Sequence, residues 1–285
     1  MTQPNKHGRL LVVGTPIGNL EDLAPRGRRA LAEADALFCE DTRVTAKLAA
    51  RFGLKARRIA CPGPREESRV AELLERLGRG ETVALVSDAG MPGLSDPGAR
   101  LVEAAAEAGY PVSVVPGPSA PAAALAVSGL SAAPHFFAGF LPAREGERRQ
   151  ALEGMRGRAE TLVWFEAPHR LRDSLAAAAD VLGPRRACVA RELTKLHEEI
   201  ARGTLPELAA RFASGSPTKG EITVVVEGGG HGARGEAVTD ADVDGRIREA
   251  LAAGASLKEL SKTIGRSAGR PARAVYARAL ELARR

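Results

Sequence analysis

The regular alternation of short apolar runs with longer amphipathic segments over residues 1–118 constrains the fold most strongly. The runs that we expect to form buried strands are Leu10–Gly14, Asp35–Cys39, Thr82–Ser87 and Pro111–Val115. Each run is short and bounded by turn residues, as is typical of buried strands. The predicted helices between them are Arg26–Ala34, Val44–Phe52, Glu66–Arg79 and Pro97–Ala108. This alternation predicts a mostly parallel sheet that helices cover on both faces.

A second set of strands and helices follows a boundary near 116–122. The expected strands are Phe136–Gly139, Thr161–Phe165, Ala187–Arg191 and Glu221–Glu227. The expected helices are Glu145–Met155, Arg170–Leu182 and Leu205–Ala213. The interval before the last strand leaves room for another strand near Glu198–Gly203, so this sheet should be mixed. The sequence therefore predicts an α/β protein with two αβα domains, 1–118 and 119–230.

Residues 231–285 are predicted to form a linker and a small, basic helical tail. The glycine-rich segment Gly228–Arg234 indicates the linker. Ser256 and Glu259 form a capping-box pattern at the start of one helix, which Gly265 and Gly269 should interrupt. Pro271 is suited to the first turn of another helix. Basic residues in 256–285 outnumber acidic ones by six, which equals the net charge of +6 of the whole chain.

The composition is that of an ordinary soluble enzyme, with 44% hydrophobic and 27% charged residues. No apolar run approaches the ~20 residues that a membrane span needs, and the polar first nine residues do not resemble a signal peptide. The three cysteines (Cys39, Cys61 and Cys188) are scattered and form no CxxC pair. We therefore expect a cytoplasmic protein without a metal site or a disulfide framework.

Three turns at predicted strand ends form a candidate ligand site. The first, Gly14–Asn19, contains Pro16, which removes a backbone donor that a phosphate would use, so a neutral or zwitterionic ligand fits better. In the second, Ser87–Pro92, Asp88 can accept hydrogen bonds from a ribose or an amine. The third, Pro116–Ala120, is stiff and ends in small residues that let a flat ligand approach. We expect Asp96, just before Pro97, to be a helix N-cap.

Five motifs in order carry a resemblance to a known family: GTPIGNLEDL, SDAGMPGLSDPG, VVPGPSA, FEAPHR and ARELTKLHEE. Together they resemble the tetrapyrrole methylase superfamily from about Leu10 to Glu227. Within it they are similar to the branch of 16S rRNA (cytidine-2′-O)-methyltransferases, which often carries a short helical C-terminal extension. The resemblance implies S-adenosylmethionine in a cleft between two αβα domains, a homodimer and no metal. The implied cofactor contacts are Pro16, Asp88, Met91, Ser119, Ala120, Phe165, Ala190 and Ile222.

Methylation of a ribose hydroxyl benefits from a base that removes its proton. Asp41, Glu40 and His169 are the candidates, and the sequence leaves the choice between them open. Three basic residues at strand ends are candidates to hold RNA phosphates: Arg43, Arg170 and Lys195. The structural alternative for all of these side chains is a helix cap or a surface ion pair.

Three basic residues of the tail recur every four positions: Lys258, Lys262 and Arg266. They should share one helix face up to the interruption at Gly265, and we expect them to contact rRNA of the small ribosomal subunit. An ordinary solvated face is the structural alternative.

Two other functions remain open. A corrin or tetrapyrrole-ring methyltransferase of the same superfamily is less favoured, because such a substrate has no need of a basic tail. A non-catalytic RNA-binding assembly factor on a methylase scaffold is also less favoured, because all the cofactor turns are present.

Overall fold

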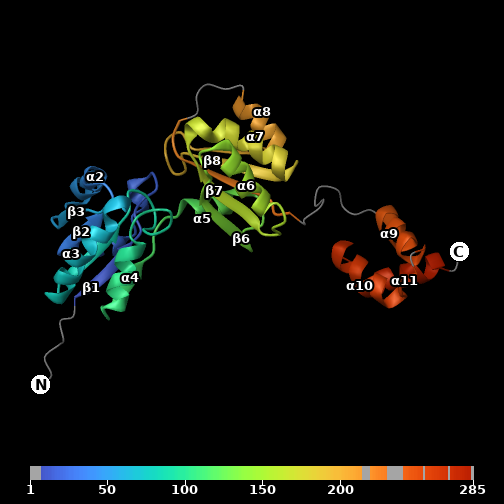
Figure 1. Cartoon of the computed structure of the whole chain (residues 1–285), viewed down its shortest axis with the longest axis horizontal. Helices are drawn as coiled ribbons and strands as arrows, with labels where there is room; N and C mark the ends of the chain where they lie inside the picture. Colours follow the sequence, from blue (N-terminus) through green and yellow to red (C-terminus); the bar gives the residue numbers. More distant parts are fainter. Residues whose placement is uncertain (1–7, 214–218, 230–239, 253, 269, 284–285) are drawn as a thin grey trace, which may run out of the picture. The chain divides into compact units, whose positions relative to one another are not determined.

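The computed structural model describes residues 8–213, 219–229, 240–252, 254–268 and 270–283, apart from the side chains of Pro64, Ala241, Arg266 and Ser267. The chain forms two compact units, Met1–Gly230 and His231–Arg285. The first unit contains two five-stranded sheets, and the second unit is helical (Figure 1). The predicted boundary between residues 118 and 119 falls inside the first unit, just before helix α5 (Ala120–Ser128).

The first sheet is entirely parallel, with strand order β3-β2-β4-β1-β5. Its strands are β1 (Arg9–Val13), β2 (Ala36–Cys39), β3 (Arg57–Ala60), β4 (Thr82–Val86) and β5 (Val112–Val115). Four of them confirm the predicted runs to within a residue or so at each end. The edge strand β3 was not predicted, because its sequence RRIA buries only one side chain, Ile59, and so shows no apolar run.

Helices cover both faces of this sheet, as predicted. Helices α1 (Pro25–Glu33) and α2 (Thr42–Phe52) share one core cluster with Leu11 and Val13 of β1. Helices α3 (Glu66–Gly78) and α4 (Ala99–Glu107) share the other with Leu10. The helices that follow the neighbouring strands β1 and β4 therefore lie on opposite faces, which opens a crevice at the carboxyl ends of these strands.

The second sheet is mixed, as predicted, with strand order β6-β7-β10-β8-β9. Its strands are β6 (His135–Phe140), β7 (Thr161–Glu166), β8 (Arg186–Arg191), β9 (Glu199–Thr204) and β10 (Ile222–Val226). Only β6 and β7 pair in parallel; the other neighbours are antiparallel. Strand β9 confirms the extra strand expected near Glu198–Gly203.

Helices also cover both faces of the second sheet. Helices α6 (Glu145–Met155), α7 (Leu171–Leu182) and α8 (Leu205–Ala213) pack on one face. Helix α5 packs on the other, where Leu125 meets Val163 and Cys188. The sequence of α5, APAAALAVS, is apolar on nearly all sides, so it lacks the periodic pattern by which a helix is predicted.

The C-terminal unit contains three helices within its described ranges: α9 (Asp240–Ala252), α10 (Leu257–Ala268) and α11 (Ala272–Ala283). Ser256 caps α10 as expected, because its Oγ accepts a hydrogen bond from the Glu259 amide at 3.3 Å. The predicted break at Gly265 is wrong. Gly265 lies inside α10, and its missing side chain lets Arg270 and Ala272 approach closely.

The unit holds together through a small apolar core that includes Ile247, Leu260 and Val275. Helix α9 was not predicted. Two predicted features lie wholly or partly outside the described residues: part of the predicted linker, 230–234, and the predicted interruption at Gly269. Gly228 packs against the backbone at Ala159 and so belongs to the first unit rather than to a linker.

Candidate active site

The predicted turns after β1 and β4 meet, because parallel strands end at the same edge of their sheet. The Thr15 amide donates to the Gly90 carbonyl oxygen at 2.8 Å, and the Gly90 amide donates back to the Thr15 oxygen at 3.2 Å. The Thr15 hydroxyl also donates to the Ser87 carbonyl oxygen at 3.1 Å. These bonds fix the two turns as one rigid wall.

The turn after β5 joins this wall through a glycine–glycine contact. A Cβ atom at Gly14 would lie 2.7 Å from the Gly117 backbone and 2.6 Å from the Met91 sulfur. A Cβ atom at Gly117 would in turn lie 2.8 Å from the Gly14 backbone. Only glycine at both positions allows this approach, so the sequence motif reflects close backbone packing.

A loop of the second sheet, 192–198 after β8, closes onto the first turn. The Asn19 amide donates to the Thr194 hydroxyl at 3.1 Å, and a Cβ atom at Gly18 would lie 2.7 Å from the Leu193 carbonyl oxygen. In this loop Glu192 and Thr194 adopt φ angles of +52° and +65°, which side-chain-bearing residues rarely adopt. Backbone strain of this kind is held by surrounding contacts and concentrates at functional sites.

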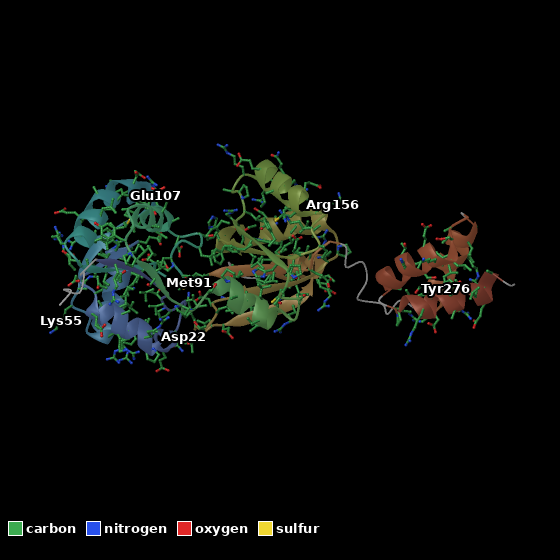
Figure 2. All side chains as sticks on the ribbon, turned by 90° about the horizontal axis from the view of Figure 1, so that it is seen from below. Asp22, Lys55, Met91, Glu107, Arg156 and Tyr276 are labelled. Carbon is green, nitrogen blue, oxygen red and sulfur yellow. The ribbon has the colours of Figure 1, made fainter. Side chains whose placement is uncertain are left out.

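A cavity of about 400 Å³ lies among these turns, and both sheets line it. We call it the main cavity. Six of the predicted cofactor contacts line it: Asp88, Met91, Ser119, Ala120, Phe165 and Ile222. In Figure 2, Met91 is on the side of the N-terminal sheet that faces the second sheet. Residues far apart in the sequence therefore meet at one concave site, as the motifs predict.

One part of the main cavity is apolar. Ile17, Leu94, Phe140 and Phe165 contribute to it, and the rings of Phe140 and Phe165 lie 5.3 Å apart. The Phe140 side chain is 56% exposed, although large apolar side chains are usually buried. An open aromatic surface beside a cavity suits a flat ligand.

The charged groups of the main cavity are all acidic. They are Asp88, Asp96, Glu166 and Glu221, and no lysine, arginine or histidine is among the described residues that line it. Burial raises the pKa of Asp88 above its usual range and raises that of Asp96 to about 6. An anionic ligand would be repelled here, whereas a ligand that carries positive charge and hydrogen-bond donors is favoured.

Glu166 adds an unsatisfied acceptor to the main cavity. Its side chain is fully buried, and its Oε1 atom accepts a hydrogen bond from the Ala167 amide at 2.9 Å. Its Oε2 atom has no hydrogen-bond partner. A buried carboxylate oxygen left unpaired is costly, so a donor from a ligand would stabilise it.

The expectation that Asp96 caps a helix is wrong. Helix α4 begins at Ala99, and Glu66 of α3 caps it by accepting hydrogen bonds from the amides of Gly98 at 3.0 Å and Arg100 at 2.7 Å. This cap comes from a distant part of the sequence and leaves the Asp96 carboxylate to the cavity.

A second cavity of about 360 Å³ adjoins the main cavity, and we call it the α2 cavity because one of its sides is helix α2. Pro16, predicted as a cofactor contact, lines this cavity and is not among the residues of the main one. The two cavities share part of their lining: Ile17, Asp88, Ala89 and Glu221.

The last predicted cofactor contact, Ala190, is not among the residues that line either cavity. It is 1% exposed and belongs to the core beneath α5. Its cross-strand partner Thr223 lines the main cavity instead. The Ala190 side chain is covered by its neighbours, so the residue of this cross-strand pair that reaches the cavity is Thr223 of β10.

The three candidate bases are not among the residues that line either cavity. Asp41 caps α2 by accepting from the Arg43 amide at 2.8 Å, and its hydrogen bonds with Arg43 lower its pKa to about 2, which makes it a weak proton acceptor. Burial, with Asp88 and Asp96 nearby, raises the pKa of Glu40. His169 is exposed in the short helix η3 (Pro168–Arg170). The structure favours the cap role for Asp41.

The three candidate phosphate contacts of the first unit all have protein partners. Arg43 pairs with Asp41 at 2.6 Å. Arg170 donates to the Leu141 and Pro142 carbonyl oxygens at 2.5 and 2.9 Å and lies 3.3 Å from Glu166. These contacts favour a structural role for Arg170. Lys195 pairs with Glu192 at 2.7 Å and lines the α2 cavity.

In the tail, Lys258 and Lys262 are exposed on α10, and the side chain of Arg266 lies outside the described residues. Across the described ranges, no group of three or more His, Cys, Asp or Glu side chains is arranged to hold a metal ion. Among the described helices, none combines the length and the apolar content that a membrane crossing requires.

Sequence relatives agree in their names. The chain is 43% identical over 274 residues to "Ribosomal RNA small subunit methyltransferase I" of Mesorhizobium japonicum, covering 96% of this chain and 92% of that protein. It is also 43% identical to the protein of the same name from Thermotoga maritima, covering 78% of this chain and 99% of that protein. The second alignment leaves about a fifth of this chain without a counterpart.

Solved structures share the fold. Uroporphyrin-III-C-methyltransferase from Thermus thermophilus matches with a TM-score of 0.56 at 22% identity, covering 77% of this chain and 94% of that one. Cobalt precorrin-4 methyltransferase matches with a TM-score of 0.59 at 18% identity, covering 80% and 97%. Residues 9–209 match the family described as Tetrapyrrole (Corrin/Porphyrin) Methylases. The chain therefore belongs to the tetrapyrrole methylase family and is a methyltransferase.

Proposed function

We propose that the chain transfers a methyl group from S-adenosylmethionine to the 2′-hydroxyl of a cytidine in 16S rRNA. The described lining of the main cavity, in which every charged side chain is acidic, is the observation that supports the choice of methyl donor. The name that the relatives share supports the choice of acceptor.

S-adenosylmethionine fits the main cavity in charge and in size. It carries a sulfonium and an ammonium group against one carboxylate, so its net charge is positive. The cavity volume of about 400 Å³ lies in the usual range of small-molecule sites. Asp88 and Asp96 would accept hydrogen bonds from its ammonium or hydroxyl groups, and Phe140 and Phe165 would cover its flat purine.

When bound, S-adenosylmethionine supplies a methyl group that its sulfonium already activates for transfer. The chain must therefore mainly place the acceptor and exclude water. The rigid wall around Thr15 and Gly90 would serve this purpose. The base that removes the hydroxyl proton stays a prediction among Asp41, Glu40 and His169.

The direct test is methyl transfer from labelled S-adenosylmethionine to purified 30S particles that lack the modification, followed by nucleoside mass spectrometry. The proposal predicts a 2′-O-methylated cytidine. A methylated base, or label in uroporphyrinogen or a corrinoid instead of 30S particles, would contradict it and favour the ring methyltransferases whose fold the chain shares.

Calorimetry separates an enzyme from a non-catalytic assembly factor. S-adenosylmethionine should bind the full chain at roughly micromolar to millimolar concentrations. Replacing Asp88 by Asn should weaken this binding, because it removes a charge from the main cavity. Replacing the exposed Asp22 by Asn changes the net charge equally and should leave binding unaltered. No binding to the unaltered chain would favour the assembly-factor function.

The tail is proposed to help dock rRNA through Lys258 and Lys262, as an accessory to the catalytic unit. The protein of the same name from Thermotoga maritima supports the accessory role, because it lacks a counterpart to about a fifth of this chain, a share similar to that of residues 231–285. A homodimer and a cytoplasmic location stay predictions, which light scattering and cell fractionation would test.

A further inference from the structure

We propose that the α2 cavity receives the acceptor nucleotide of the RNA, with Lys47 holding a backbone phosphate beside it. The inference rests on the proposed function and assigns the part of the site that the RNA enters.

The α2 cavity has the position that an acceptor site requires. A methyl donor and its acceptor must meet within contact distance. The α2 cavity shares Ile17, Asp88, Ala89 and Glu221 with the main cavity, so ligands in the two cavities would be neighbours. The Asp41 amide donates to Asp88 Oδ1 at 3.1 Å and fixes this carboxylate at the shared wall.

The two cavities differ in charge. Among the described residues, the charged groups that line the main cavity are all acidic, whereas the α2 cavity also has Lys47 and Lys195. Glu192 and Glu221 neutralise Lys195, at 2.7 and 3.4 Å. Lys47 is exposed and makes no ion pair with any residue that the structure describes, so it is available to a phosphate group.

The rim of the α2 cavity is apolar in a way that suits a nucleobase. Leu20 and Val44 line the cavity and are 39% and 37% exposed. Val44 and Lys47 follow the i, i+3 spacing, so one face of α2 presents a cation next to an exposed apolar side chain. A base could cover the apolar atoms while its phosphate contacts the ammonium group.

This combination favours a nucleotide over a tetrapyrrole. A tetrapyrrole macrocycle is larger than a nucleotide and carries several carboxylates around its rim, for which a single unpaired lysine provides little compensation. One phosphate and one base require one cation and one apolar surface, and the α2 cavity offers both.

The test compares Lys47→Ala with Lys55→Ala in the full chain. Both changes remove one exposed lysine, but Lys55 lies on the outer side of the N-terminal sheet, away from Met91 (Figure 2). Affinity for 30S particles is measured without methyl donor over a salt series, and affinity for S-adenosylmethionine is measured separately. Methyl transfer to 30S particles is then followed at saturating donor.

Lys47→Ala should weaken 30S binding about tenfold, the loss expected for one charge-assisted contact. The slope of log affinity against log salt should fall by about 0.7, as for one lost single-strand phosphate contact. Affinity for S-adenosylmethionine should stay within about twofold, because Lys47 is not among the residues of the main cavity. Lys47→Arg, which keeps the charge, should restore most of the 30S affinity.

Equal effects of Lys47→Ala and Lys55→Ala on affinity and slope would overturn the inference. Methyl transfer to uroporphyrinogen should also be measured. If the unaltered chain methylates uroporphyrinogen and Lys47→Ala does not, while 30S binding is unchanged, a ring substrate would replace the nucleotide in the α2 cavity. Salt-dependent 30S binding through Lys47, without methyl transfer by the unaltered chain, would contradict the proposed function while supporting the RNA site. Failure of the RNA site and failure of the proposed function would therefore give different results.

Discussion

Replacing Asp96 by Asn should make the protein more stable and its cofactor binding weaker. The Asp96 carboxylate lies in the main cavity, where burial is the largest influence on its pKa. A hydrogen bond with Ser87 opposes the effect of burial, and the nearby carboxylates of Asp88 and Glu221 add to it. A site that keeps an ionised group in such surroundings sacrifices stability for binding.

The size and sign of the effect follow from the two pKa values. The pKa of Asp96 is about 6 in the folded protein, against an ordinary 3.8. At about 1.4 kcal/mol for each pH unit, the ionised carboxylate costs at most about 3 kcal/mol, and about 1 to 2 kcal/mol after allowing for solvent screening. This loss in the free energy of unfolding is absent below pH 3.8, grows as the pH rises to about 6 and is complete above it.

Urea unfolding of both proteins between pH 4 and 8 would measure this difference. Asp96→Asn should be the more stable at pH 8 by about 1 to 2 kcal/mol and nearly equal to the unaltered chain at pH 4. Its affinity for S-adenosylmethionine at pH 8 should fall about tenfold. Asp22→Asn should show neither effect. A stability difference that does not vary with pH, or a less stable Asp96→Asn at pH 8, would show that the ionised Asp96 carboxylate does not destabilise the folded protein.

Other predictions test the packing around the site. Glu66→Ala should lower the free energy of unfolding by about 1 to 2 kcal/mol in thermal melts, because it uncaps α4. Gly18→Ala should cost about 1 to 3 kcal/mol, whereas Gly146→Ala, which faces open space in α6, should stabilise slightly; equal effects would contradict the close packing. Phe140→Ala should change stability by less than about 0.5 kcal/mol but weaken S-adenosylmethionine binding in calorimetry. Deleting 231–285 should preserve that binding and reduce 30S affinity and its salt slope; loss of cofactor binding would contradict an accessory tail.

Most of the fold could be predicted because its strands and helices carry clear patterns. Buried parallel strands such as β1 and β4 are continuous apolar runs, and α3 has one apolar stripe. Elements without such patterns were missed. Strand β3 has one buried side chain at a sheet edge, and α5 is apolar nearly all round.

The site was partly predictable because its turns are local. Asp88 and Ser119 could be placed from strand ends alone, since parallel strands end at one edge. Asp96 could not be placed in the cavity from the sequence, because the residue that caps α4 in its stead, Glu66, lies 32 positions before Gly98 along the chain. A local pattern at Asp96-Pro97 does not reveal a distant competitor for the same role.

The roles that the structure suggests for Glu166 and Lys47 could not be predicted from the sequence. Glu166 stands in the FEAPHR motif, but its buried, half-satisfied carboxylate depends on the packing of Arg170 and the second sheet. Lys47 is one of many exposed basic residues, and only the cavity beside α2 distinguishes it from Lys55.

A crystal structure of the full chain with S-adenosylmethionine would show directly where the methyl donor binds. We expect electron density for the ligand in the main cavity, with its positive groups near Asp88 or Asp96 and its purine against Phe165 or Phe140. Clear density for the ligand at another site, with the main cavity holding only water, would contradict it.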